Sequence, residues 1–75
     1  MKYIVFKHLG DEVPVLFSDI IQHRSMAAIM GLTDKQLISA GFVAKTRGEI
    51  DAFGESYTLN LQSRPEDTRI IADLF

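Results

Sequence analysis

The chain has 75 residues, of which 47% are apolar and none is cysteine, and its formal charge is −2. These values describe one small soluble domain, residues 1–75, whose fold depends on packing alone because no disulfide can form. The lack of cysteine excludes thiol catalysis and metal sites built on cysteine, and it fits a reducing compartment. Eight Lys and Arg against ten Asp and Glu do not favour nucleic acid as the default partner.

No segment has the character of a membrane span or a secretory signal. The longest apolar runs, residues 3–6 and 26–30, have four and five residues, whereas a span needs about 20. Lys7 restores charge directly after the first run, and no small-residue cleavage site follows it. We therefore expect the protein in the cytoplasm.

Two stretches with strand character open the chain and predict a β-hairpin. Residues 2–9 are rich in β-branched and aromatic side chains, residues 10–12 have turn composition, and residues 13–17 resume the strand character. Pro14 lacks the N–H that a central strand needs, so the second strand is expected at a sheet edge. Residues 18–24 are expected to be irregular or to form a single turn.

A short helix is predicted over residues 26–30, with Ser25 as its cap and Gly31 as the residue that ends it. Residues 33–36 (TDKQ) have the form of a capping box and admit a further helical turn. The alternation that begins at Ile38 favours a strand instead. The choice between helix and strand stays open at this point.

The second half of the sequence predicts a three-stranded meander. Turns are expected at residues 47–48 and 54–55, the latter a two-residue type II′ connection, with strands over residues 49–53 and 56–62. Apolar and polar residues alternate in the last strand, so one of its faces is expected to be dry. The residues of that face are Tyr57, Leu59 and Leu61.

A second capping-box match, residues 63–66 (SRPE), predicts a C-terminal helix with Ser63 as cap and Asp67 in the first turn. The apolar stripe of this helix is expected to cover the dry face of the meander. The stripe consists of Ile70, Ile71, Leu74 and Phe75. The expected order is ββ-α-βββ-α, an α+β fold in which a small antiparallel sheet packs with a middle and a C-terminal helix.

Three segments resemble short bacteriophage or prophage proteins of unknown function. They are residues 39–43 (SAGFV), 54–59 (GESYTL) and 63–67 (SRPED), and the likeness extends over the C-terminal half and residues 23–27. The resemblance implies a phage-encoded protein that acts in the bacterial cytoplasm, either in virion production or against a host factor. It transfers no catalytic activity and no site residue.

Residue types that commonly act in catalysis or metal binding are few and are scattered along the sequence. His8 and His23 are the only imidazoles, and they lack the spacing of a metal-binding pair, so we expect no metal and no cofactor. No serine stands in a nucleophile motif, and two serines are expected to act as caps, so we do not expect an enzyme. The serines considered are Ser18, Ser25, Ser39, Ser56 and Ser63.

Both faces of the predicted hairpin are apolar, which favours a protein-interaction role. The second face either lies under residues 18–30 or meets another chain. We expect a homodimer, or binding to a host or virion protein, through this hairpin and its edge strand. The residues expected at the interface are Ile4, Phe6, Pro14 and Leu16.

A sheet-based nucleic-acid binder is the alternative hypothesis, and a small enzyme is the third. The nucleic-acid contacts would be Lys45 and Arg47 at a hairpin tip, with Phe53 and Tyr57 as platforms on which bases stack. Acidic residues on the same hairpins weigh against this hypothesis. They are Glu49, Asp51 and Glu55.

Overall fold

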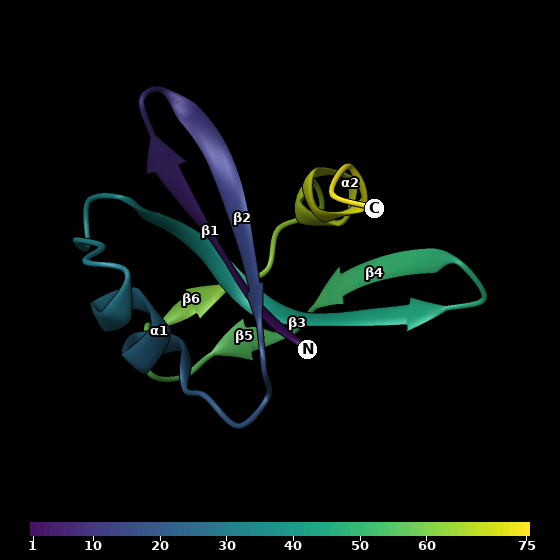
Figure 1. Ribbon diagram of the computed structural model, residues 1–75, viewed down its shortest axis with the longest axis horizontal. Helices are drawn as coiled ribbons and strands as arrows, with labels where there is room; N and C mark the ends of the chain where they lie inside the picture. The colour runs from purple at the N-terminus through teal and green to yellow at the C-terminus, as the bar shows by residue number, and fades with distance from the viewer.

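Four antiparallel strands form the main sheet of the computed structural model, which describes residues 1–75. The strand order is β2-β1-β3-β4, so β2 lies at an edge, as Pro14 predicts. Figure 1 shows the long strand β3, whose first half pairs with β1 and whose second half pairs with β4. The strands are β1 (Lys2–His8), β2 (Asp11–Phe17), β3 (Leu37–Thr46) and β4 (Glu49–Phe53).

Two short helices and a separate two-stranded ladder complete the fold. The α+β class and the expected order of hairpin, helix, strands and helix are confirmed. Neither helix has the length and apolar character that crossing a bilayer requires. The elements are α1 (His23–Ile29), α2 (Asp67–Ala72), and the ladder of β5 (Glu55–Ser56) with β6 (Leu61–Gln62).

Both hairpins of the main sheet close through two-residue turns with positive φ. Leu9 and Gly10 have φ of 52° and 87°, and residues 47–48 have 51° and 84°. Positive φ at both positions defines a type I′ turn, whose twist matches that of the strands it joins. The second turn lies where the sequence predicts it. The first precedes the predicted residues 10–12, because Asp11 already pairs with β1.

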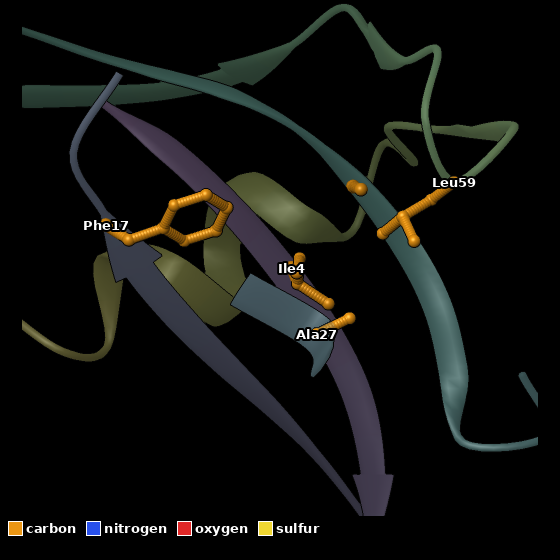
Figure 2. Close-up of a cluster of buried hydrophobic side chains, with 5 residues drawn as sticks. Ile4, Phe17, Ala27 and Leu59 are labelled. Atoms are coloured by element: carbon orange, nitrogen blue, oxygen red, sulfur yellow. The ribbon is translucent and has the colours of Figure 1, made fainter. Parts of the chain in front are cut away.

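The two faces of the main sheet bury separate apolar clusters, since neighbouring residues of a strand point to opposite sides. Ile4 packs with Ala27 of α1 in the first cluster, which Figure 2 shows. Tyr3 and Val5 pack with Ile71 of α2 in the second. Both faces of the N-terminal hairpin are therefore covered within the chain. The first cluster consists of Ile4, Phe17, Ala27, Ala40 and Leu59.

Helix α1 begins earlier than the sequence predicts. Its N-cap is Gln22, which makes no side-chain capping bond, and Ser25 lies within the helix, so the expected Ser25 cap is wrong. The buried ring of His23 anchors the first residue of the helix to the sheet through a hydrogen bond with the carbonyl of Gly41. The helix ends as predicted at Gly31, which has a φ of 70°.

The segment after α1 resolves the choice between helix and strand. Residues 33–36 make a single turn, in which the backbone N–H of Thr33 donates to the side-chain oxygen of Gln36 at 3.0 Å. Strand β3 then starts at Leu37, so the strand prediction is correct. The capping-box pattern forms its contact here without starting a helix.

The predicted strand over residues 56–62 does not form. Strand β5 stops at Ser56, whose Oγ accepts a hydrogen bond from the N–H of Leu59 at 3.2 Å, and four residues turn before β6 begins. This turn buries Leu59 but leaves Tyr57 92% exposed. Because β5 pairs with β6 and not with β4, the three-stranded meander and the type II′ turn at residues 54–55 are wrong, as is the core position of Tyr57.

Helix α2 packs on the face of the sheet opposite to the predicted one. Ile71 is fully buried in the second cluster, whereas Leu59 and Leu61 belong to the first. The rest of the stripe is only partly covered, because Leu74 is 54% exposed and Phe75 is 62% exposed.

The start of α2 also differs from the prediction. Its N-cap is Glu66, without a side-chain capping bond, so the expected Ser63 cap is wrong. The carboxylate of Asp67 instead closes the turn that precedes the helix, where it accepts a hydrogen bond from the backbone N–H of Arg64 at 2.9 Å.

Candidate functional site

A pocket opens where the end of β4 and the β5–β6 turn meet the start of α1. Its volume is about 450 Å³. Four rings contribute to its lining: His23, Phe42, Phe53 and Tyr57. The charged side chains at the pocket are Lys2 and Glu55, and Gln22, Gly54 and Thr58 complete the lining.

A row of aromatic rings connects the pocket with the core. The ring of His23 makes edge contacts with Phe17 and Phe42, with centroids 5.5 and 5.8 Å apart, and Phe42 stacks on Phe53 at 6.0 Å. Such pairs contribute about 0.5–1.5 kcal/mol each beyond the area they bury. The row runs from Phe17, which is 7% exposed, to Phe53, which is 46% exposed. Ring contacts that begin at a buried core residue therefore fix the position of the pocket wall.

His23 is the second ring of this row and stays uncharged at neutral pH. Its Nε2 donates a hydrogen bond to the carbonyl of Gly41 at 2.9 Å, which places the proton on Nε2. Burial lowers the pKa of His23 below its usual value and the charge of Lys2 lowers it further, against the opposing effect of the Gly41 bond. The residue therefore serves as a neutral aromatic wall at pH 7.

Two glycines make room for the aromatic wall. A Cβ atom at Gly41 would collide with the backbone carbonyl oxygen of Phe53. Gly54 has a φ of 80°, and a Cβ there would lie 3.0 Å from the ring of Phe42. Both positions require glycine if the rings of the pocket are to keep this arrangement.

Two cations join the α1 side of the pocket to neighbouring backbone. The ammonium of Lys2 donates to the carbonyl of Ile21 at 2.9 Å. The Nε of Arg24 donates to the carbonyl of Thr58 at 2.8 Å, and the Arg24 backbone N–H donates to the Thr58 hydroxyl at 3.1 Å. The two Arg24 bonds tie α1 to the turn that carries Tyr57, and the Lys2 bond ties β1 to the segment before α1. Glu55, in contrast, forms neither an ion pair nor a side-chain hydrogen bond.

Comparisons with protein families, curated proteins and solved structures gave no match. The interpretation of the pocket therefore rests on its lining. Exposed aromatic side chains around a concave, preformed site are typical of binding sites, where burial of their apolar surface drives association.

The structure changes the expected N-terminal interface. Ile4 is fully buried and Phe6 is 8% exposed, so neither side chain is available to a second chain. Leu16 and Pro14 are half-buried on the edge strand, and Leu16 packs against the second core cluster. The expected surplus of apolar surface at the hairpin is therefore wrong, because α1 and α2 cover both faces.

The residues expected to bind nucleic acid are divided between two faces. Lys45 pairs across the strands with Ile50, on the α2 side, and its ammonium lies 4.9 Å from the ring centroid of Phe75. Phe53 pairs with Phe42 on the opposite face, and Arg47 lies in the exposed turn. The basic tip and the aromatic platform are therefore not combined. Phe53 does meet Tyr57, as neighbours in the pocket.

A cluster of hydrogen-bonded polar side chains around Asp67 lies away from the pocket and stabilises the fold. The buried carboxylate of Asp67 accepts hydrogen bonds from the phenol of Tyr3 at 2.6 Å and from Arg64, whose guanidinium also contacts Glu12 at 2.9 Å. Burial by itself would raise the pKa of Asp67, but these donors together hold it below its usual value. Burial and the nearby carboxylate raise the pKa of Tyr3, so the phenol keeps its proton.

His8 and Ser18, which were also considered for catalysis, lie outside both the pocket and the group around Asp67. His8 is exposed at the end of β1, opposite Asp11. The hydroxyl of Ser18 accepts the N–H of Ile20 at 3.3 Å, within its own turn. Nowhere do three His, Asp or Glu side chains gather in an arrangement that could hold a metal ion.

Proposed function

We propose that this protein is a small protein-binding module whose pocket accepts an apolar side chain of a partner protein. One observation carries the proposal: Tyr57 and Phe53, which are 92% and 46% exposed, line a concave pocket of about 450 Å³. Aromatic residues of this kind provide most of the binding energy in many protein interfaces.

The rigidity of the pocket supports the same role. Phe53 stacks on Phe42, which contacts the buried ring of His23, so the wall needs little reordering when a side chain enters. A preformed site avoids part of the entropy cost of association. Because this cost is smaller, a few anchor contacts can be sufficient for a small chain to bind a partner.

The proposal assigns this binding to the cytoplasm and to a host or virion protein, the partner class that the resemblance to phage proteins implies. Pairing with a second copy of the chain is the homomeric version of the same proposal. In that version too the pocket takes the place of the hairpin face, because Ile4 and Phe6 are buried.

Affinity capture with matched variants tests the proposal. The tagged wild-type chain is compared with a Phe53→Ala, Tyr57→Ala variant, and with a Leu9→Ala, Ile20→Ala control whose residues are each 91% exposed and are absent from the pocket lining. Loss of two anchors is expected to reduce recovery of a specific protein about tenfold or more, since anchor residues contribute about 2 kcal/mol or more. The control is expected to retain it.

Equal recovery by all three proteins would contradict the proposal, as would equal loss by both variants. Thermal unfolding of each variant is measured alongside, so that a loss caused by unfolding is recognised. Recovery of nucleic acid alone, eluted by salt, would favour the nucleic-acid hypothesis instead.

A further inference from the structure

We infer that the partner segment accepted by the pocket is basic, with its apolar anchor flanked by lysine or arginine. The inference rests on the proposed function and adds the chemistry of the partner. It follows from the charges beside the pocket and from the sheet face that leads into it.

The outward face of β4 carries carboxylates on one side of the pocket. Glu49, Asp51 and Phe53 alternate along the strand and share one face, because Ile50 and Ala52 point into the second cluster on the other face. Glu49 and Asp51 are exposed, and neither forms an ion pair or a side-chain hydrogen bond. This face of β4 is negatively charged up to the ring of Phe53.

Glu55 continues the negative charge into the pocket itself. It is exposed, contributes to the pocket lining next to Phe53, and has no ion-pair partner. The carboxylates that a bound segment would meet on this side are Glu49, Asp51 and Glu55.

The nearby cations form no ion pair with these carboxylates. Lys2, which lines the pocket, and Arg24 keep their positive charge, but they donate to the neutral carbonyls of Ile21 and Thr58. Lys45 lies on the opposite face of the sheet, over the ring of Phe75. A bound segment would therefore meet negative charge along β4 and would find ion-pair partners there.

The same face of β4 is free for an extended segment. Helix α2 covers the opposite face, where Ile50 and Ala52 pack against the cluster of Ile71. At the outer edge of β4, the hydroxyl of Thr68 accepts a hydrogen bond from the N–H of Ala52 at 3.1 Å. The facing residues of β3, Ala44 and Thr46, are small and exposed. Residues 49–53 span about 13 Å at the rise of a β-strand, which a partner segment of about five residues would cover.

The charge pattern favours a peptide over a nucleic acid. A single strand that stacked a base on Phe53 would bring its phosphates next to Asp51 and Glu55, and like charges repel. A basic peptide places its anchor in the pocket and its cations next to the same two carboxylates, so both interactions are favourable at once.

NMR titration of the full-length chain with three defined probes tests the inference. The probes are a heptapeptide with a central tryptophan between lysines, the same peptide with glutamates in place of lysines, and octathymidylate. The basic peptide is expected to shift the amide signals of Phe53, Tyr57 and Thr58 and to bind more tightly than the acidic one. Raising the salt concentration is expected to reduce this difference.

Matched charge variants separate a local effect from a change in net charge. An Asp51→Lys, Glu55→Lys variant is compared with an Asp11→Lys, Asp34→Lys control, in which exposed carboxylates outside the pocket lining are reversed. Each exposed ion pair is typically worth about a two- to fivefold change in affinity, so the first variant is expected to weaken basic-peptide binding about tenfold. The control is expected to change it by less than about twofold.

Each other outcome overturns the inference in a distinct way. Equal or tighter binding of the acidic peptide at the pocket would refute the basic chemistry and leave the proposed function standing. If both charge variants weakened basic-peptide binding equally, the change in affinity would come from net charge and not from the carboxylates at the pocket. If neither peptide shifts the pocket signals, the proposed function fails as well, and octathymidylate shifts at Phe53 and Tyr57 would assign the pocket to nucleic acid.

Discussion

Replacing Tyr3 by phenylalanine removes a single oxygen atom from the buried hydrogen-bond cluster around Asp67. The phenol donates to the carboxylate at 2.6 Å, and Tyr3 is fully buried, so its ring keeps the same packing in the variant. A hydrogen bond to a charged group contributes about 1.5–3 kcal/mol. Asp67 retains three bonds from Arg64, so the carboxylate is not left without donors and a cost of about 2 kcal/mol is expected.

This cost is large for a chain of 75 residues. At about 0.05–0.15 kcal/mol per residue, the free energy of unfolding is about 4–11 kcal/mol, so the variant folds but with a reduced margin. The midpoint of thermal unfolding is expected to fall by about 8–16 °C. Circular dichroism during thermal and urea unfolding measures both quantities.

The pH dependence of this cost identifies its cause. The pKa of Asp67 is lower in the folded state than in the unfolded chain, so its stabilising effect is complete above the unfolded pKa and is lost as the pH falls through the folded pKa. The stability difference between wild type and Tyr3→Phe is therefore expected to be constant between about pH 5 and 8 and to narrow below about pH 4.

Tyr57→Phe is the matched control. It removes the same oxygen from a side chain that is 92% exposed and forms no hydrogen bond, so stability is expected to change by less than about 0.5 kcal/mol. Equal losses of stability in the two variants would refute the stabilising role of the hydrogen bond between Tyr3 and Asp67. A stability difference between wild type and Tyr3→Phe that stays unchanged at low pH would refute it as well.

Three further outcomes follow from the packing. Ile71→Ala is expected to cost about 2–5 kcal/mol in urea unfolding because Ile71 is fully buried, whereas Leu74→Ala, at a side chain 54% exposed, is expected to cost far less; similar costs would mean that α2 does not pack through Ile71. Gly41→Ala is expected to cost about 1–3 kcal/mol or more, since the added methyl meets the carbonyl of Phe53, and an unchanged unfolding midpoint would contradict this contact. The pKa of His23 is lower in the folded state, so the unfolded chain takes up the proton first and stability is expected to fall as the pH drops below about 6.5; a His23→Gln variant that keeps the same pH profile would contradict this assignment.

Local patterns in the sequence were sufficient to predict the two hairpins and the edge position of β2. Pro14 excludes a central strand, and the Gly48 turn fits a two-residue connection. These features depend on residues that are neighbours in the chain or across one turn. Gly31 ends α1 for the same kind of local reason.

The alternation of residues 56–62 misled the prediction because a tight turn can satisfy the same pattern. Ser56 holds the N–H of Leu59, and Asn60 adopts a φ of 55°, a conformation that asparagine tolerates better than most residues. The turn buries Leu59 and leaves Tyr57 outside. The asparagine was the one local signal against a continuous strand.

The pocket could not be predicted from the sequence because its walls come from separate elements. His23, Phe42 and Tyr57 come from α1, β3 and the turn after β5, and only tertiary packing brings them together. The sequence did single out Phe53 and Tyr57 as an aromatic pair, but it combined them with the cations of the hairpin tip. The strand register puts Lys45 on the other face.

Photo-crosslinking from position 57 shows directly whether the pocket binds a partner protein. Tyr57 is replaced by benzoylphenylalanine in the full-length chain, which is irradiated in its native cell, and Leu9, 91% exposed and absent from the pocket lining, is replaced in the same way as a control. We expect one specific protein to be crosslinked from position 57 and not from position 9. The same crosslinked proteins from both positions, or none from position 57, would contradict it.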